Sequence, residues 1–271
     1  MFPLKIPSSS IVKNTVKSAF KGKRVPATLA SLTVVFAYYL ISMLVSGMAS
    51  VMNNYFELLA IGIFVISAVF ILLPLLLGVV RFFWRLTGGA DDNPTAVFYY
   101  FSSSFLYKRA IKLALLLAFR CACVTVVCLL PYIIVFTLSN TWIYQFLGTE
   151  MPLWVAGMTL LESFLQVTGF FVAFILSLRY YLTPVVAVMD DDLLLLEAVH
   201  ISVMVSHRSV SAFGGLIASL IGWILLSFFV IPLIYTVPLL LGCYVVHGRF
   251  ALVNYNLSLD YYEKEGYNLS I

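Results

Sequence analysis

Six long apolar stretches run through this chain, and they constrain its fold more than any other feature. They lie at about residues 27–48, 57–80, 113–137, 153–178, 212–229 and 233–253. A helix that crosses a hydrocarbon core of about 30 Å needs about 20 mostly apolar residues. Because the stretches are close to this length, we expect an all-α fold, a polytopic membrane bundle of six transmembrane helices.

The composition agrees with this expectation. Of the 271 residues, 62% are hydrophobic and 10% are charged, and the mean hydropathy is +1.04. Soluble domains are about 45–50% apolar and about 25% charged. An excess spread over the whole chain excludes a soluble domain on one anchor helix. The connecting segments reach about 35 residues at most, below the roughly 40 needed for independent folding, which excludes a hidden soluble catalytic domain.

The last two stretches form one apolar run at 211–253, broken by Gly222, Pro232 and Pro238. A single helix of that length would measure about 63 Å, twice the thickness of the hydrocarbon core. Pro232 cannot donate a backbone hydrogen bond. We therefore expect a tight hairpin near residues 230–233.

The basic residues outside the stretches fall on one side of a six-span arrangement. Residues 1–26 carry six Lys or Arg, and residues 81–112 carry five. The loops of the opposite side, which carry none, are 49–56, 138–152 and 230–232. Because cytoplasmic loops are enriched in Lys and Arg, we expect both termini in the cytoplasm and the protein in the cell membrane. The expected organisation is a basic segment at 1–26, a transmembrane domain at 27–254 and a tail at 255–271.

The N-terminal segment has the pattern of an amphipathic helix. Val12, Val16 and Phe20 recur every four residues. Such a helix can lie in the headgroup plane, where anionic lipid attracts each lysine by about 1 kcal/mol. A plain positively charged flank explains the sequence equally well. The candidate headgroup contacts are Lys13, Lys17, Lys21 and Lys23.

Two further amphipathic interfacial helices are expected near residues 94–109 and 193–208. Asn93 and Pro94 suit the cap and the first position of the former, and Asp192 suits the cap of the latter. One face of the former carries Phe98, Phe101 and Phe105.

A short spacing recurs in these three segments. It reads Ser18, Phe20, Lys23, Arg24, then Ser103, Phe105, Lys108, Arg109, then Ser202, Met204, His207, Arg208. Duplicated units are common in membrane folds. The hypothesis is a threefold repeat of interfacial helix and membrane hairpin, in which the three segments occupy equivalent places; the alternative is a chance match.

Arg120 and Glu162 lie well inside the expected spans, where charge is expensive. In the structural interpretation, Arg120 extends to the headgroups and Glu162 is protonated or hydrogen-bonded. In the functional interpretation, both line a path for an ion or substrate. Direct pairing across a simple hairpin looks strained, because Arg120 lies nearer the cytoplasmic side.

Gly214, Ala218 and Gly222 repeat every four residues. Small residues let helix backbones approach closely in lipid. We expect this face to pack against another helix of the same chain, with a dimer contact as the alternative.

Other polar groups give weaker indications. Asp190, Asp191 and Asp192 fit a DxD pattern of metal-nucleotide sites, but Mg²⁺ would need further ligands, so a solvated loop is favoured. A lipid-modifying enzyme using Asp190 and Asp192 is the less favoured alternative. The cysteines are expected to be buried apolar fillers: Cys121, Cys123, Cys128 and Cys243.

Several function classes are excluded or disfavoured. The net charge is +4, but the basic residues flank apolar stretches and form no solvated face, so nucleic acid is not an expected partner. Hydrolase, phosphate-loop and dinucleotide motifs are missing from the sequence. We therefore expect no enzyme activity, no cofactor and no metal.

One block before and within the fifth stretch resembles a known family. The block consists of Glu197, Ala198, Ser202, Ser219, Ile221, Gly222, Trp223, Leu225 and Leu226. It is similar to a large bacterial family of uncharacterised integral-membrane proteins, related to the membrane domain of membrane-anchored glycerophosphodiester phosphodiesterases. This resemblance implies six spans without an assigned activity, and no catalytic residues, since the phosphodiesterase barrel is absent. Arg208 and Ser209 replace the Gly-Lys pair usual in the family.

These observations together predict a non-enzymatic protein of the bacterial inner membrane with a lipid-facing or assembly role, whose partners are membrane lipids. The alternative is a small transporter or permease-like component in which Arg120 and Glu162 line a path.

Overall fold

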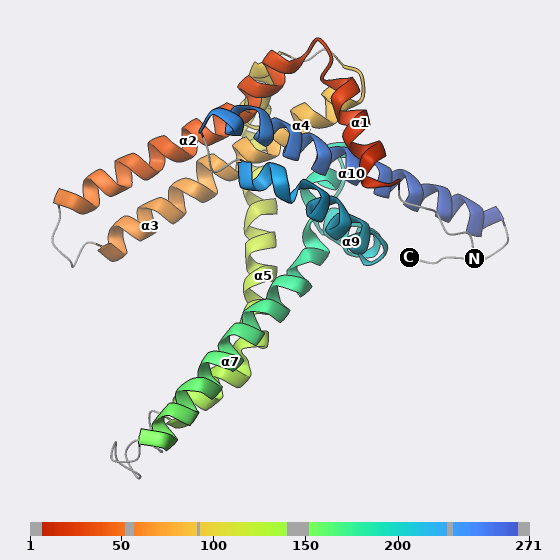
Figure 1. Cartoon of the computed structure of the whole chain (residues 1–271). Coiled ribbons are helices and arrows are strands. Elements are labelled where there is room, and N and C mark those ends of the chain that lie inside the picture. The colour runs from red at the N-terminus through yellow and green to blue at the C-terminus, as the bar shows by residue number, and fades with distance from the viewer. Residues whose placement is uncertain (1–6, 52–56, 91–92, 140–151, 227–229, 265–271) are drawn as a thin grey trace. The chain divides into compact units, whose positions relative to one another are not determined.

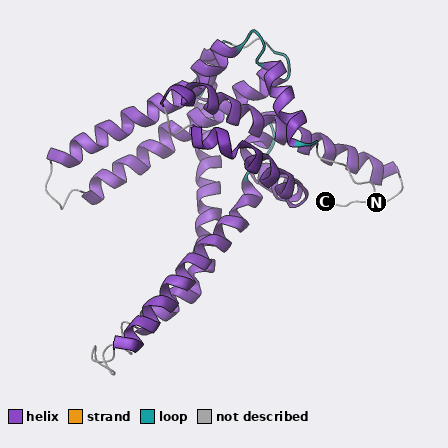
Figure 2. Ribbon diagram, viewed as in Figure 1, coloured by secondary structure: helices purple, strands orange, loops and turns teal. Residues whose placement is uncertain are grey.

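The computed structural model describes residues 7–51, 57–90, 93–139, 152–226 and 230–264 (Figure 1). Every regular element in these ranges is a helix (Figure 2), which confirms the all-α prediction. Six helical segments are long and apolar enough to cross a membrane: Arg24–Gly47, Gly62–Thr87, Ser104–Leu138, Ala156–Met189, Leu195–Leu226 and Ile234–Asn256. The chain is therefore a multi-pass membrane protein.

The chain divides into two compact units. The larger contains Met1–Ala114 and Leu182–Ile271, and the smaller contains Leu115–Tyr181. The long helix α5, Ser104–Leu138, begins in the larger unit and continues into the smaller. The rest of the smaller unit contains α7, Pro152–Ser177, and the short 3-10 helix η5, Leu178–Tyr180.

The core of the larger unit lies where five helices meet. These are α1 (Ser9–Ala19), α4 (Leu73–Thr87), α8 (Thr183–Met189), α9 (Leu195–Leu226) and α10 (Val230–Lys264). Its fully buried side chains include Phe82, Phe83, Leu86, Leu182, Val185 and Val245. This part of the membrane protein is thus built on a packed protein core.

The amphipathic helix expected at the N-terminus is α1, but its apolar face does not lie in lipid. Val12, Val16 and Phe20 are buried. A Cβ placed on Gly242 of α10 would lie 2.8 Å from Val16 Cγ1 and 2.9 Å from the Phe20 ring. Glycine at this position opens a groove on α10 that accepts the apolar face of α1. Of the two interpretations of this segment, the one in which the apolar face inserts into the membrane is therefore wrong.

The second span is interrupted along its length. Helix α2, Arg24–Val51, packs beside α3, Glu57–Ser67, through the rings of Tyr38 and Phe64, 6.2 Å apart. The π-helix η2, Ala68–Leu72, then joins α3 to α4. A π-helical turn marks an interruption in the regular i to i−4 hydrogen bonding of the helix.

The other two interfacial helices are not separate elements. Residues 94–109 form a 3-10 helix, η3 (Pro94–Phe101), followed by the first residues of α5. Ser102 and Ser103 separate the two, because their hydroxyls bond locally to the Tyr99 carbonyl and the Phe105 amide. Of residues 193–208, those from Leu195 onward form the first part of α9, which continues beyond them without a break. The Ser209 hydroxyl donates to the Val205 carbonyl, so this serine is satisfied within the helix.

The predicted threefold repeat is also wrong. Its first segment crosses the end of α1 and a turn, the second begins α5, and the third lies inside α9. Phe20 is buried whereas Phe105 is 70% exposed. Arg109 is buried whereas Arg24 is exposed. The three segments therefore do not occupy equivalent places.

A break between the fifth and sixth helices is confirmed, since α9 ends at Leu226 and α10 begins at Val230. Its predicted place at residues 230–233 is wrong, because these residues form the first turn of α10. Pro232 lies in the first turn of α10, where a missing N–H costs nothing. Parts of the other predicted loops and of the tail lie outside the described residues: 52–56, 140–151 and 265–271.

Candidate functional site

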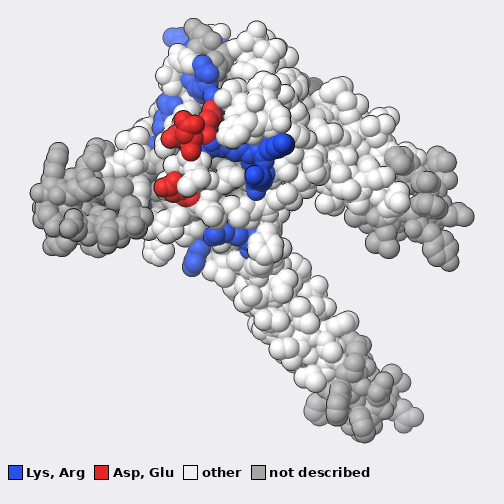
Figure 3. Space-filling view, turned by 180° about the vertical axis from the view of Figure 1, so that it is seen from behind, with Lys and Arg blue, Asp and Glu red and all other residues white. Residues whose placement is uncertain are grey.

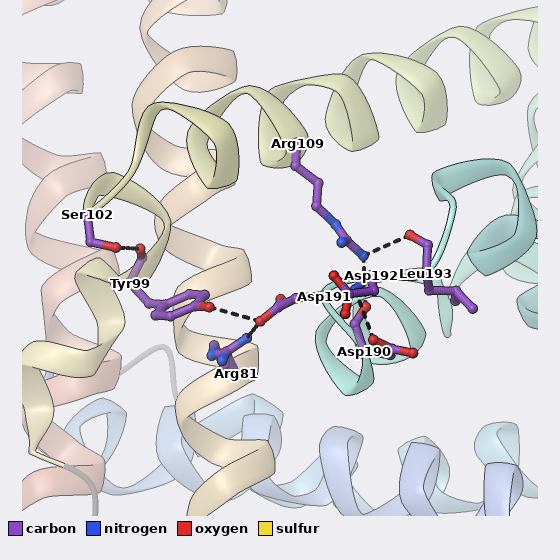
Figure 4. Close-up of polar contacts among 8 residues, drawn as sticks. All are labelled: Arg81, Tyr99, Ser102, Arg109, Asp190, Asp191, Asp192 and Leu193. Carbon is purple, nitrogen blue, oxygen red and sulfur yellow. Dashed lines mark hydrogen bonds and ion pairs between the residues drawn. The ribbon is translucent and has the colours of Figure 1, made fainter.

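Polar side chains from four segments of the larger unit meet beside the middle of α4. Arg81 comes from α4, Tyr99 from η3, Arg109 from α5, and Asp191 from the link between α8 and α9. Figure 4 shows Arg81, Tyr99 and Asp191 pointing toward one another, while Arg109 reaches to the link itself. We call these four residues the polar junction.

A close backbone contact positions Tyr99. A Cβ on Gly78 of α4 would lie only 1.9 Å from the Val97 carbonyl oxygen, so glycine alone lets η3 lie this near to α4. Val97 and Tyr100 are buried on that side. Tyr99, between them in sequence, is left to extend along α4 toward Arg81.

The Asp191 carboxylate connects two of these segments. Its Oδ2 accepts a hydrogen bond of 2.7 Å from Arg81 Nη1 and one of 2.9 Å from the Tyr99 hydroxyl. The Arg81 guanidinium carbon lies 3.5 Å from the centroid of the Tyr99 ring. Charge-assisted hydrogen bonds and a cation-π contact thus reinforce one another. Asp191 Oδ1 is buried and has no hydrogen-bond partner among the described residues.

Arg109 holds the backbone of the same link. Its Nη2 donates to the carbonyls of Asp190, at 2.8 Å, and Leu193, at 3.0 Å. Asp190 Oδ1 also accepts from the Asp192 amide at 2.9 Å. The acidic run therefore folds as a turn, and α9 begins only at Leu195. The prediction that Asp192 caps the helix is wrong.

The two tyrosines of η3 are kept neutral. Burial raises the pKa of Tyr100 to about 12, and the nearby Asp191 carboxylate adds to this shift. Burial, followed by the hydrogen bond to Asp191, also raises the pKa of Tyr99. Both phenols therefore stay protonated at neutral pH, and Tyr99 remains a hydrogen-bond donor to Asp191.

The polar junction has the chemistry of a structural connection. Among the described residues, no group of three or more His, Cys, Asp and Glu side chains is placed to hold a metal. The Asp191 carboxylate is engaged by a cation and a phenol. The arrangement is therefore suited to holding η3, α4 and the α8–α9 link together.

A second basic contact joins α10 to the end of α4. Arg249 Nη2 donates 2.7 Å to the Trp84 carbonyl, and its guanidinium carbon lies 4.4 Å from the centroid of the Trp84 ring. The same carbonyl also accepts a hydrogen bond of 3.2 Å from the Gly88 amide, so Arg249 is a second donor to it. Arg249 thus caps α4 from a different helix. Near this point Lys23 donates to the Ala90 carbonyl at 3.3 Å.

The four candidate headgroup lysines have different surroundings. Lys13 Nζ donates 2.7 Å to the Ser219 carbonyl of α9, and Lys23 is the residue bonded to Ala90. Lys17 is exposed on the face of α1 opposite the buried valines, and Lys21 is exposed in the turn that follows the helix. On the face shown in Figure 3, acidic side chains lie beside basic ones.

Arg120 and Glu162, both in the smaller unit, are not brought together. Glu162 accepts a hydrogen bond from Ser139, directly after the end of α5. Arg120 precedes Ser139 by 19 positions along the helix, or about 28 Å at the helical rise. The two side chains therefore lie at opposite ends of this hairpin, as the sequence argument against direct pairing predicted.

The small-residue face of α9 does not pack within the chain's described part. Gly214, Ala218 and Gly222 are exposed, and a Cβ on either glycine would meet nothing within 4 Å. The prediction of an internal helix contact here is wrong. The glycines in close contact include Gly78, Gly242 and Gly169, whose Cβ would lie 2.9 Å from the Cys128 carbonyl oxygen.

The cysteines are free thiols with different exposures. Cys243 is buried, as predicted for an apolar filler, whereas Cys123 is exposed and Cys121 and Cys128 are intermediate. The prediction that all four are buried is therefore wrong. An apolar span can expose a thiol where a soluble core would bury it.

No protein-family model, curated protein or solved structure matches this chain. The resemblance to the bacterial six-span family therefore stays a prediction. The polar junction and the lysines of α1 are interpreted from their own geometry.

Proposed function

We propose that this chain is a non-enzymatic protein of the bacterial inner membrane that binds anionic phospholipid headgroups along its cytoplasmic face. The observation that carries the proposal is the docking of α1. Its apolar side is buried on α10, which leaves Lys17 exposed on the opposite side and Lys21 exposed in the turn that follows α1. Lysines fixed in this way lose little conformational freedom when they meet a headgroup phosphate.

The contacts of the larger unit support the proposed orientation. Lys23 bonds to Ala90 after α4, Arg249 bonds to Trp84, and Arg109 bonds to the α8–α9 link. These contacts gather the segments that the positive-inside rule assigns to the cytoplasm. Both termini are thus proposed to be cytoplasmic, and the loop at 138–152 is proposed to lie outside.

The resemblance of the block from Glu197 to Leu226 supports membership of the bacterial family of integral-membrane proteins that this block resembles. The proposal carries over no activity from it. A path lined by Arg120 and Glu162 gains no support, because the two side chains lie at opposite ends of their hairpin.

Lipid selectivity tests the proposal. The full chain is reconstituted in phosphatidylcholine vesicles that contain spin-labelled phosphatidylglycerol or spin-labelled phosphatidylcholine, and the motionally restricted fraction of each lipid is compared. A Lys17→Gln, Lys21→Gln double variant is expected to lose roughly ten- to thirtyfold in preference for phosphatidylglycerol at low salt, since each lysine contributes about 1 kcal/mol.

The matched control is the Lys17→Arg, Lys21→Arg variant, which keeps both charges and is expected to keep the preference. Equal preferences in the glutamine variant and the unmodified chain would contradict the proposal.

A further inference from the structure

Helix α1 crosses the pair formed by α9 and α10 partway along its length. Lys13 Nζ bonds to the Ser219 carbonyl of α9 at 2.7 Å. Val16 and Phe20 cover Gly242 of α10. The crossing point is thus fixed by one charged contact and one apolar contact.

Helices α9 and α10 run antiparallel, so residues at the same level can be paired. The rings of Trp223 and Tyr235 lie 5.6 Å apart, and those of Phe213 and Tyr244 lie 6.4 Å apart. Residues earlier in α9 therefore pair with residues later in α10. Ser219 and Gly242, which lie between these pairs, are at nearly the same level.

The outer face of α1 sets the position of the headgroups. Asn14, Lys17 and Ser18 are exposed on it, and Lys21 is exposed in the turn that follows. A lysine at the centre of a bilayer is energetically costly, and further polar groups on the same face add to this cost. The whole of α1 must therefore lie at or above the headgroup level, and that level reaches along the pair at least to Ser219 and Gly242.

The part of the pair beyond α1 is too short to cross a membrane. It comprises Leu220–Leu226 of α9 and Val230–Leu241 of α10, joined by three residues outside the described part. At the helical rise these segments measure about 11 Å and about 18 Å, against a hydrocarbon core of about 30 Å. Helix α2, with 28 residues, measures about 42 Å by the same arithmetic.

We propose that Leu220–Leu226 and Val230–Leu241 are the two arms of a re-entrant hairpin, which enter the membrane from the cytoplasmic side and reach only to about the bilayer centre. Its partner is the acyl region of the cytoplasmic leaflet. The exposed apolar side chains that meet these acyl chains include Ile221, Leu225, Leu226 and Ile234.

The remaining parts of α9 and α10 have surfaces that are consistent with a position outside the lipid. The first part of α9 exposes Glu197, His200, His207 and Arg208, a polar face unsuited to lipid. The part of α10 after Gly242 is instead buried in protein, with Val245, Val246 and Ala251 at most 3% exposed. The high hydropathy of these helices thus reflects packing in the protein core as well as contact with lipid.

The depth of the hairpin end distinguishes a re-entrant hairpin from two full spans. Single cysteines at Leu226→Cys and Ile234→Cys, in a full chain whose native cysteines are replaced by alanine, are labelled with nitroxides in vesicles of phosphatidylethanolamine and phosphatidylglycerol. Collision rates with oxygen and with a water-soluble nickel chelate give the depth. Two positions are used so that one misfolded variant does not decide the outcome.

The control labels are Val126→Cys, in the middle of α5, and Leu138→Cys, at its end. We expect the labels at Leu226 and Ile234 to match the deep label at Val126. Depths that match the shallow label at Leu138 would overturn the inference, whether the labels lie at the outer surface or flat on the inner one.

The inference rests on the proposed position of α1 at the headgroups, so a Lys17→Cys label is measured as well. If the Lys17 label lies at headgroup depth but the labels at the hairpin end are shallow, only the re-entrant hairpin is rejected. A Lys17 label that reports water without headgroup contact would reject both proposals.

Discussion

The hydroxyl of Tyr107, in the first turn of α5, donates a hydrogen bond of 3.0 Å to the carbonyl of Phe70. In a regular α-helix this carbonyl accepts from residue 74, but residue 74 is proline and has no backbone N–H. Tyr107, on another helix, thus donates to a carbonyl that lies within the π-helix η2. The interrupted second span and α5 are joined at this point.

Removing this hydroxyl is expected to weaken the larger unit. Tyr107→Phe deletes the bond to Phe70 but keeps the ring, which packs 5.6 Å from that of Phe101. The free energy of unfolding is expected to fall by about 1 kcal/mol, the usual net value of one such bond. Titration with a denaturing detergent, followed by circular dichroism, measures it.

The control is the same Tyr107→Phe substitution in a protein that also carries Pro74→Ala. Pro74→Ala restores the backbone donor for Phe70, so Tyr107→Phe is expected to cost close to nothing when alanine occupies position 74. Equal costs in the two backgrounds would show that the hydroxyl stabilises the fold in some other way.

The contact between α4 and η3 is expected to tolerate no side chain at Gly78. In Gly78→Ala the new Cβ would lie 1.9 Å from the Val97 carbonyl oxygen, a backbone atom that cannot turn away. Overpacking of this kind costs typically 1–3 kcal/mol, and we expect a loss of at least about 3 kcal/mol, measured by the same detergent titration.

Gly214→Ala is the matched control, because its Cβ would meet nothing within 4 Å in another glycine-containing helix. It is expected to stabilise by up to about 1 kcal/mol through helix propensity. Similar effects of the two substitutions would contradict the contact between Gly78 and Val97.

The helical content and the approximate spans could be predicted from the sequence, because apolar length is a local property. The role of α1 could not. The spacing of Val12 and Val16 predicts an apolar face but cannot say whether lipid or protein covers it. That depends on Gly242, some 225 residues away, whose missing side chain creates the groove on α10.

The polar junction could not be predicted from the sequence pattern either. Arg81 reads as one more basic residue beside a span, and Tyr99 as an ordinary interfacial aromatic. The sequence offers Arg81 two acidic runs as partners, Asp91 with Asp92 and Asp190 to Asp192. The first run is nearer in sequence but lies outside the described residues. Only the fold brings Asp191, 110 positions away, to Arg81.

Neutralising Asp191 is expected to loosen the junction. Asp191→Asn removes the charge that both Arg81 Nη1 and the Tyr99 hydroxyl engage. Hydrogen bonds to a charged group contribute about 1.5–3 kcal/mol. Because both members of the pair are partly exposed, we expect a loss near the lower end, about 2 kcal/mol, in the free energy of unfolding.

Asp192→Asn, in the same turn, provides the comparison. Asp192 is exposed, so its substitution is expected to change stability by less than about 0.5 kcal/mol. Proteolysis at the α8–α9 link gives a second measurement, which is expected to accelerate for Asp191→Asn only. Equal behaviour of the two variants would show that Asp191 does not hold the link.

The buried phenol of Tyr100 is expected to make stability depend on alkaline pH. Its pKa is about 12 in the fold, against a usual value of 10.0. Since the folded state holds this proton more tightly, the stabilisation is complete below about pH 10 and is lost as the pH rises through about 12. Two pKa units correspond to about 3 kcal/mol.

Tyr100→Phe isolates this contribution from those of the other tyrosines. The Tyr100 hydroxyl has no hydrogen-bond partner among the described residues, so its removal is expected to leave stability at neutral pH unchanged or slightly higher. Above about pH 10 the variant is expected to lose stability less steeply than the unmodified chain, because phenylalanine has no proton to release. Unfolding measured over the alkaline range provides the comparison, and parallel curves would mean that water reaches Tyr100 in the folded protein.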